Sequence, residues 1–536
     1  MKIVTASQMA ALEGESERLG VSTGVLMEKA GLAVAQGVRR SLGGLVAGVK
    51  IAVLVGPGNN GSDGLVTARL LRCWGAEVTS CLLTRRPGED TKLEMATGYG
   101  VRVLSLDQAD LDRKAALSGL DSVLRESRLV VDAVLGTGRS RPLDGWLKDV
   151  SNLLSHHRSA GGLTVLALDL PTGLDADTGQ VDPACFTADL TIALGFPKVG
   201  LLTLPGAAMA GSLEVVDIGL PPGVEEEPGI SSGLNLELLT SEWVAKQLPA
   251  RPADSHKGTF GHALVIAGSR NYVGAAFLAA QAAVRAGAGL VTLATPQSVY
   301  PTAAAKLTEP IHLPLPEDGA GRIDPTAAAL IKDSTSRYTA VLVGCGLGWS
   351  PGTARFVQDF LLGQPSDGQP VIIDADGLNN LSEVPDWWQR LTQPVVVTPH
   401  PGEMATLTGA SAGAAMIQSG RVASAREWAA RWGVAVVLKG AYTVVAEPGG
   451  MVRISPFANP GLASGGTGDV LSGIIVGLMA QGLDPGQAGA CGVYVHGLAG
   501  EKAVQTRGNA GTIASDLVDL LPETMREIKT LGGIKG

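Results

Sequence analysis

The chain has few cysteines and no excess of positive charge. Its 536 residues include 5 cysteines, and 42 lysines and arginines stand against 51 aspartates and glutamates. The net charge of −9 argues against nucleic acid as a main partner, because no basic surface would offset the phosphates. The cysteines are scattered, odd in number and without metal-ligand spacing. They indicate reduced thiols, so we expect a cytoplasmic protein.

Long hydrophobic runs are also absent. No stretch approaches the ~18 uninterrupted apolar residues that mark a membrane span, and the first residues lack the apolar centre of a signal peptide. We therefore expect no membrane partner. With 45% hydrophobic and 17% charged residues, the composition is that of a globular protein. At ~150 residues per domain, the length predicts two or more domains.

The clearest linker lies near the middle of the chain, at Leu220-Pro-Pro-Gly-Val-Glu-Glu-Glu-Pro-Gly. It combines turn residues with a short acidic run and has no apolar period. We therefore expect a first domain at 1–222, a linker at 223–238 and a second domain at 239–536. On both sides, short β-branched runs alternate with longer helical runs, which predicts two α/β domains with parallel sheets. The strands expected are 49–55, 77–83, 129–134, 164–168, 190–193, 213–217, 263–267, 290–294, 340–343, 371–374, 395–398 and 434–438.

A glycine-dense loop near the C-terminus carries the strongest chemical signal. It reads Asn459-Pro-Gly-Leu-Ala-Ser-Gly-Gly-Thr-Gly-Asp469 and runs into an apolar helix. Backbone N–H groups of Gly465, Gly466 and Gly468, with the helix N-terminus, would form an anion hole sized for phosphate. Asp469 beside it is a candidate base for a hydroxyl that attacks phosphorus. The alternative is a glycine loop with an aspartate helix cap.

Other loops in the second half also follow predicted strands, and no Gly-Lys-Ser/Thr motif occurs, which excludes a P-loop. Lys439 and Thr443 are candidates for contacts with a nucleotide, and His400 and Glu403 for orienting a polar substrate. Two alternatives stay open: Lys439 as a solvent-exposed charge at a strand end, and His400 as a rigid turn residue between two prolines.

Three loops in the first half each follow a predicted strand and carry polar side chains. Gly56-Pro-Gly-Asn-Asn-Gly61 formally fits the dinucleotide fingerprint, with Arg85 and Arg86 placed to recognise a 2′-phosphate. Such a match is weak alone, and the paired asparagines offer polar donors and acceptors instead. Loops starting at Val131 and Leu168 also follow strands, and in open α/β sheets ligands bind at these edges. We expect Asp132 and Asp169 to face one crevice with Asn60, although each aspartate alone is typical of a turn.

The residues of the first half resemble the NAD(P)HX epimerase family. The resemblance rests on Asn59-Asn-Gly-Ser-Asp-Gly64, Val131-Asp-Ala-Val-Leu-Gly-Thr-Gly138 and Asp169-Leu-Pro-Thr-Gly-Leu-Asp-Ala-Asp-Thr-Gly179. It implies a Rossmann-like three-layer domain that interconverts the R and S epimers of hydrated NADH and NADPH, with Asp169 at the reacting ring and a potassium ion held by Asn60, Asp132 and Thr172. The substrate contacts implied are Asn59, Asn60, Gly61, Ser62, Asp63, Gly136, Thr137, Gly138, Arg139, Ser140, Arg141, Pro142 and Asp169.

The second half resembles the ADP-dependent NAD(P)HX dehydratase family, a ribokinase-like branch, through Asn459–Asp469 and Val493-Tyr-Val-His-Gly-Leu-Ala-Gly500. Cys345 stands where this family usually has proline. The resemblance implies that Gly346, His400, Pro401, Gly402, Glu403, Met404, Ala405, Thr406 and Asp469 bind the hydrated dinucleotide. It implies that ADP with Mg²⁺ binds at Lys439, Gly440, Ala441, Tyr442, Thr443, Leu462, Ala463, Ser464, Gly465, Gly466, Thr467 and Gly468.

Together the two resemblances imply a homo-oligomeric enzyme that repairs hydrated NADH and NADPH. Asp469 would deprotonate the C6 hydroxyl as it attacks the nucleotide's terminal phosphoryl group, and the phosphate ester would then eliminate. The alternative is a small-molecule kinase of ribokinase-like fold joined to a non-catalytic binding domain.

Overall fold

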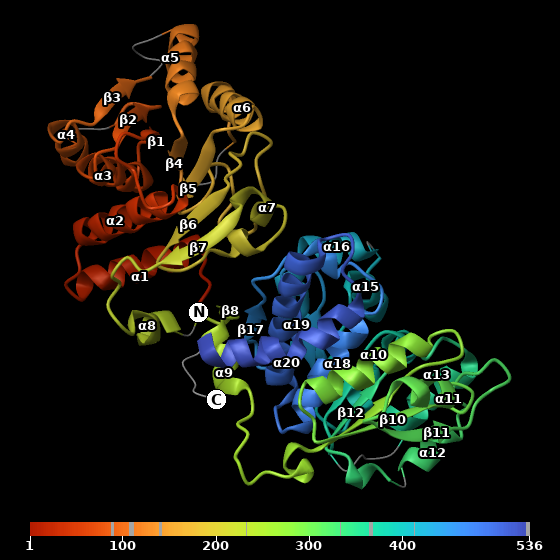
Figure 1. Ribbon diagram of the computed structural model, residues 1–536. Coiled ribbons are helices and arrows are strands. Elements are labelled where there is room, and N and C mark those ends of the chain that lie inside the picture. The colour runs from red at the N-terminus through yellow and green to blue at the C-terminus, as the bar shows by residue number, and fades with distance from the viewer. Residues whose placement is uncertain are drawn as a thin grey trace. The chain divides into compact units, whose positions relative to one another are not determined.

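The computed structural model describes residues 1–86, 90–106, 112–138, 142–231, 233–332, 334–363, 368–411 and 413–531. The chain folds into two compact units, Met1–Leu234 and Asn235–Gly536. Each unit holds one sheet with helices on its faces (Figure 1). The α/β class predicted from the sequence is therefore confirmed in both halves.

The first unit has a seven-stranded parallel sheet in the order β3-β2-β1-β4-β5-β6-β7. This order contains the 3-2-1-4-5-6 arrangement of Rossmann-like folds. Its strands are β1 Lys50–Val55, β2 Glu77–Leu82, β3 Arg102–Ser105, β4 Leu129–Ala133, β5 Thr164–Leu168, β6 Leu190–Leu194 and β7 Ser212–Val216. Its main helices are α1 Ala6–Arg18, α2 Thr23–Ser41, α3 Asn59–Cys73, α4 Thr91–Gly98, α5 Arg113–Glu126, α6 Gly145–Ser159, α7 Gly206–Ala210 and α8 Pro228–Ser231.

Alternate residues of the central strands face two separate cores. Val53 and Val55 of β1 pack with α2 and α3 on one face. Ala52 and Leu54 of the same strand pack with α5 and α6 on the other. Both faces are apolar because a parallel sheet is covered on both sides. The sheet therefore has only its edges free for polar chemistry.

The second unit has a ten-stranded sheet in the order β11-β10-β9-β12-β13-β14-β15-β16-β17-β8, parallel from β11 to β15 and antiparallel at β15-β16 and β16-β17. Its strands are β8 Leu236–Leu238, β9 His262–Ile266, β10 Leu290–Pro296, β11 Ile311–Leu315, β12 Ala340–Val343, β13 Val371–Ile373, β14 Val395–Val397, β15 Ala435–Leu438, β16 Val444–Ala446 and β17 Val452–Ile454. Its helices are α9 Ser241–Gln247, α10 Val273–Arg285, α11 Tyr300–Lys306, α12 Ala327–Lys332, α13 Pro351–Leu362, α14 Asp376–Leu381, α15 Pro401–Thr408, α16 Gly413–Ser419, α17 Arg421–Trp432, α18 Thr467–Ala480, α19 Pro485–Arg507 and α20 Ala514–Leu531.

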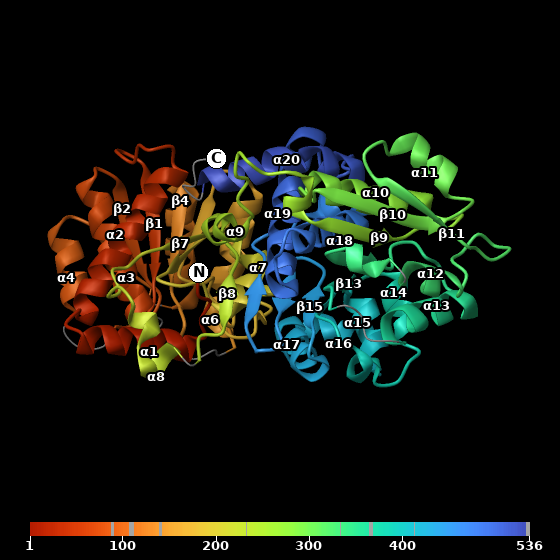
Figure 2. The same ribbon diagram turned by 90° about the horizontal axis from the view of Figure 1, so that it is seen from below.

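Helices α10, α18 and α19 form one layer over this sheet, and Figure 2 shows α12, α13 and α14 on its other side. Helix α18 is apolar nearly all round and is almost entirely buried. A Cβ on Gly473 would lie 2.3 Å from the carbonyl oxygen of Ala279. The lack of a side chain at Gly473 therefore lets α18 approach α10 closely.

The predicted strands all occur, with ends shifted by a residue or two, while β3, β8, β11, β16 and β17 were missed. The missed strands are short or lie at the sheet edges, so their patterns are weaker. The predicted linker 223–238 contains the division between the units: its first part forms α8, which packs on α1, and its last part forms β8. Within the described residues, no helix is long and apolar enough to cross a membrane.

Candidate active sites

A cavity of about 700 Å³ lies at the carboxyl edge of the first sheet. The register pairs Val55 of β1 with Ala133 of β4 and Asp132 of β4 with Ala167 of β5, so the loops after these strands begin side by side. All three rim loops identified in the sequence contribute residues to the cavity. The polar or loop residues that line it are Glu13, Thr23, Pro57, Gly58, Asn59, Asn60, Asp63, Gly136, Thr137, Gly138, Asp169 and Lys198.

Asp169 follows β5 and is held in a left-handed backbone conformation, with φ of 69°. Such a conformation is uncommon for a non-glycine residue and is frequent at functional sites. Its Oδ1 atom accepts hydrogen bonds from Lys198 Nζ (2.5 Å) and from the backbone N–H of Leu194 (3.0 Å). Lys198 is 0% exposed, yet it lines the cavity. Sequence reasoning missed Lys198, because a lone lysine after a strand carries no motif.

Asp132 and Thr172 lie in direct contact. The backbone N–H and the hydroxyl of Thr172 each donate to the Asp132 carboxylate at 2.8 Å. The carboxylate is 0% exposed, and burial raises the pKa of Asp132 to about 6 despite these bonds. Asn60 lies beside Gly136, and Gly136 belongs to the loop that follows β4. Its amide nitrogen is buried and has no hydrogen-bond partner among the described residues.

The loop after β1 does not bind a 2′-phosphate through Arg86, because this arginine is occupied by the protein. Its guanidinium contacts the carbonyl oxygen of Gly56, the hydroxyl of Ser62 (2.7 Å) and the carboxylate of Asp90. The arginine therefore stiffens the loop. Helix α3 begins at Asn59, so the asparagine pair lies in its first turn.

Some of the predicted substrate contacts lie away from the cavity. Gly61 and Ser62 sit in the first turn of α3 without lining it, and Pro142 is exposed outside it. The remaining three, Arg139, Ser140 and Arg141, lie outside the described residues.

In the second unit, a buried ion pair stands at the carboxyl ends of the central strands. Lys439 follows β15 and donates to Asp374, which follows β13, at 2.7 Å. The hydroxyl of Ser472 on α18 also donates to Asp374, at 2.7 Å. Burial acts to raise the pKa of Asp374, but the Lys439 ammonium and these hydrogen bonds outweigh it, and the pKa is lowered. Lys439 is therefore not a solvent-exposed charge; sequence reasoning did not find its partner.

Asp469 lies in the first turn of α18, close to this pair. One ligand atom from each of Cys345, Asp374 and Asp469 falls within 4.8 Å of the others. Burial, and then the nearby Asp374 charge, raise the pKa of Asp469 to about 6. A carboxylate with this pKa is mostly ionised near neutral pH and is a stronger base than an exposed aspartate.

The glycine loop is shaped by its own polar contacts. Gly466 has φ of 92°, and a Cβ there would lie 2.6 Å from Leu278. The Thr467 hydroxyl donates to the carbonyl oxygens of Leu462 (2.9 Å) and Ser464 (3.0 Å), which ties the loop to the helix start. The first N–H groups of a helix have no partner within it, so they remain available to an anion.

The strand-end segment from Lys439 to Thr443 lies next to this loop, since a Cβ on Gly468 would be 3.7 Å from Lys439 Nζ. Tyr442 has φ of 53°, and the Thr443 hydroxyl donates to the carbonyl oxygen of Gly440 at 2.7 Å. Arg421, which the sequence did not single out, is buried and donates to the carbonyl oxygens of Leu438 and Lys439.

His400 caps helix α15. Its Nδ1 accepts from the backbone N–H groups of Gly402 (3.0 Å) and Glu403 (3.2 Å), and the Glu403 carboxylate accepts from the His400 N–H (2.7 Å). This capping box confirms the turn role suggested by the flanking prolines. The His400 Nε2 atom lies 3.5 Å from the Glu403 carboxylate, and the His400 side chain is 56% exposed.

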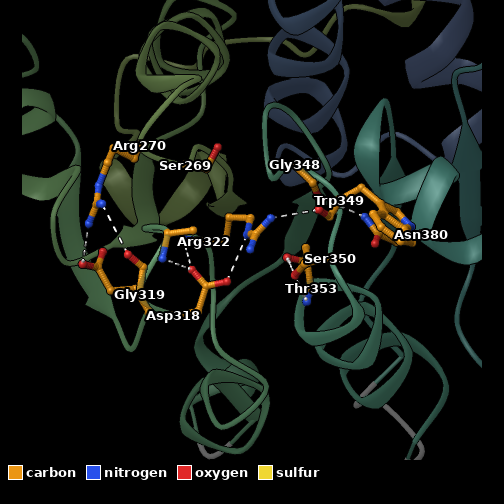
Figure 3. Close-up of polar contacts among 12 residues, drawn as sticks. Ser269, Arg270, Asp318, Gly319, Arg322, Gly348, Trp349, Ser350, Thr353 and Asn380 are labelled. Carbon is orange, nitrogen blue, oxygen red and sulfur yellow. Dashed lines mark hydrogen bonds and ion pairs between the residues drawn. The ribbon is translucent and has the colours of Figure 1, made fainter.

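The loop around Gly346 is anchored on several sides (Figure 3). The Ser269 hydroxyl donates to the Gly346 carbonyl oxygen at 2.8 Å. Arg322 donates to the Trp349 carbonyl oxygen (3.1 Å) and pairs with Asp318 (3.0 Å). The carbonyl oxygens of Gly346 and Trp349 are thus bound by protein groups, which restrains this loop.

Comparisons with known proteins cover both units. A family model described as NAD(P)H-hydrate dehydratase matches residues 263–523, and one described as YjeF-related protein N-terminus matches residues 23–200. Bifunctional NAD(P)H-hydrate repair enzymes from Moorella thermoacetica and Thermofilum pendens are 41% and 37% identical, each over 99% of this chain and 97% of the relative. A solved ADP/ATP-dependent NAD(P)H-hydrate dehydratase from Bacillus subtilis, co-crystallised with ATP and Mg²⁺, is 34% identical over 55% of this chain and 100% of its own, with a TM-score of 0.48.

Proposed function

The chain belongs to the family of bifunctional NAD(P)H-hydrate repair enzymes, and we propose that its two units divide the repair of hydrated NADH and NADPH between them. The first unit interconverts the R and S epimers. The second unit removes water from the S epimer with the help of an adenine nucleotide. The observation that carries this proposal is the match over nearly the whole length of two-activity relatives. It favours repair over the alternative of a small-molecule kinase joined to a binding domain.

In the first unit, we assign the hydrated ring to the cavity beside Asp169. Its side chain forms an ion pair with Lys198, and a carboxylate there can stabilise positive charge on the ring or accept a proton. Asn59, Asn60 and Gly136–Gly138 line the same cavity and supply amide and backbone groups to the substrate.

A potassium ion fits the group formed by Asn60, Asp132 and Thr172. These side chains carry hard oxygen donors, and Asp132 is a fully buried carboxylate with only uncharged hydrogen-bond partners. The unpartnered Asn60 amide nitrogen becomes an oxygen donor if the amide is turned over, because the two assignments are hard to distinguish. When bound, the ion supplies positive charge that offsets the buried carboxylate and holds the two rim loops together.

In the second unit, we propose that Asp469 removes the proton from the C6 hydroxyl as this oxygen attacks the terminal phosphoryl group of Mg²⁺–ADP. The N–H groups at the start of α18 face the charge that develops on the phosphoryl oxygens. Lys439–Thr443 and the glycine loop hold the nucleotide, and His400 and Gly346 border the dinucleotide. The C6–O bond of the phosphate ester then breaks, inorganic phosphate leaves with the bonding electrons, and loss of a ring proton restores the dihydronicotinamide.

One assay on the purified chain tests both activities. Hydrated NADH with Mg²⁺–ADP should regain the absorbance of reduced nicotinamide for both epimers. Asp469→Asn should abolish this recovery while epimerisation continues, and Asp169→Asn should leave only the S epimer repaired at the wild-type rate. No nucleotide-dependent recovery in the wild type would refute the dehydratase assignment. Release of a stable phosphoester would instead support the kinase.

We also propose ADP as the preferred nucleotide, a homo-oligomeric assembly and a cytoplasmic location. The five cysteines are all free thiols, which fits a reducing compartment. Initial rates with ADP and ATP at equal concentration test the first point, and light scattering of the purified chain tests the second.

A further inference from the structure

We propose that Asp63 is the proton donor that works with Asp169 in epimerisation. This inference rests on the proposed epimerase function of the first unit. Inversion at C6 requires the hydroxyl to leave and return on the other face of the ring. Hydroxide leaves poorly, so a proton must be delivered to the departing oxygen, and Asp169 paired with a lysine is poorly suited to deliver it.

The geometry sets Asp63 apart from the other acidic residues of the unit. It lies in α3, lines the same cavity as Asp169 and Lys198, and is only 7% exposed. Its Oδ1 atom is buried and has no hydrogen-bond partner in the part of the chain that the structure describes. Buried polar atoms are nearly always hydrogen-bonded, so this oxygen calls for a partner that is absent here. A substrate hydroxyl in the cavity supplies one.

The charges around Asp63 favour its protonated form. Burial, followed by the Asp169 charge and Glu13 on α1, raises the pKa of Asp63 well above its usual range, and Lys92 on α4 lowers it only partly. Lys92 is itself paired with Glu28 on α2. Lys198 contacts Asp169 and not Asp63. The cavity thus holds two carboxyl groups in different surroundings: Asp63, whose charged form is disfavoured, and Asp169, which is ion-paired with Lys198. Such a difference divides acid and base roles between two like groups.

The reaction balances with these two groups. Asp63 gives its proton to the C6 oxygen, the C6–O bond breaks, water departs, and the ring nitrogen's lone pair forms an iminium bond to C6. The Asp169 carboxylate stabilises this cation. Water then adds to the opposite face of C6, the iminium electrons return to nitrogen, and Asp169 accepts the proton that the water loses. Proton exchange between the two carboxyl groups restores the starting state, and no oxidant or reductant is consumed.

Glu13 is the competing candidate, because it lines the cavity and its pKa is also raised, by burial and then by Asp169. It is less suited, since its side chain lies partly open to solvent and water can satisfy its oxygens. The two residues can be separated by experiment.

The test measures epimerisation of R-NADHX against pH for wild type, Asp63→Asn, Asp63→Glu, Glu13→Gln and the surface control Asp121→Asn. Wild type should lose activity at high pH as Asp63 ionises. Asp63→Asn should be slower by about 10²-fold or more and lack that alkaline limb, while Asp63→Glu should restore part of both. Asp121, on α5 and paired with Arg125 and His157, should behave as wild type when changed.

Folding is monitored in the same chain by thermal unfolding and by the dehydratase activity of the second unit. An Asp63→Asn rate within threefold of wild type overturns the inference. The inference is also overturned if Asp63→Asn is slow but still loses activity at high pH. It is overturned as well if Glu13→Gln no longer loses activity at high pH. If wild type does not exceed the spontaneous rate, the epimerase function itself fails, which is a distinct result.

Discussion

The dehydratase rate should fall in mild acid if the partly buried Asp469 is its base, as proposed. The pKa of Asp469 is raised to about 6, mainly by burial and then by Asp374. The group acts as a base, so activity is present above this pKa and is lost as the pH falls through it. An exposed aspartate, with a pKa near 3.8, would show no such loss above pH 5.

The size of the effect follows from the titration. At pH 5 a group with a pKa of about 6 is roughly one-tenth ionised, whereas one with its usual value is more than about nine-tenths ionised. The kcat/KM of dehydration should therefore drop about tenfold between pH 7.5 and pH 5. This parameter reports the free enzyme, which is the state whose contacts are described above.

Substitutions of Cys345 should shift the midpoint of the same pH profile. Its thiol is 0% exposed and lies within reach of both carboxylates, and its hydrogen bond lowers the pKa of Asp469. Cys345→Ala removes this donor, so the midpoint of the pH profile should move upward. Cys345→Ser keeps a donor, so its midpoint should stay at or below that of wild type.

The assay is the initial rate of absorbance recovery from S-NADHX at low substrate concentration, from pH 5 to pH 8.5 at constant ionic strength. Thermal unfolding at each pH separates titration from loss of structure. A flat profile down to pH 5 would refute Asp469 as a base of raised pKa. A downward shift of the midpoint in Cys345→Ala would refute the role given to the thiol.

Four further outcomes are expected. Lys439→Met should cost about 3–5 kcal/mol of unfolding free energy, measured in urea, because it leaves the buried Asp374 carboxylate without its ion-pair partner. Lys50→Met removes a solvent-exposed ion pair with Glu126 and should change the unfolding free energy little. Gly466→Ala should destabilise the chain by roughly 1–3 kcal/mol because its φ is positive. A Cβ on Gly465 meets no protein atom within 4 Å, so Gly465→Ala should keep its unfolding temperature but bind ADP more weakly by calorimetry. Potassium in place of choline should raise the unfolding temperature of wild type but not of Asp132→Ala, as scanning calorimetry can show.

Local patterns were sufficient for most of the fold. The apolar runs of the central strands and the glycine and asparagine turns after them are short-range signals, so the strands and the rim loops followed from the sequence. Edge strands such as β3 and β11 did not, because half-exposed residues have no continuous apolar run.

What the sequence determined by itself is the set of chemical groups: Asp169 and Asp469 in turn-rich loops, the glycine loop, and the resemblance that connects them to repair of hydrated nicotinamides. The partners of these groups came only from the tertiary structure. Lys198 lies 29 residues from Asp169, and Lys439 lies 65 residues from Asp374. Ion pairs of this kind form because separate strands end at one sheet edge. Burial at that edge raises the pKa of Asp63 and of Asp469. It also leaves the Asp63 Oδ1 atom without a hydrogen-bond partner among the described residues. Neither burial nor long-range pairing is encoded in a local motif, so the acid, the base and their supporting lysines became distinguishable only in the folded chain.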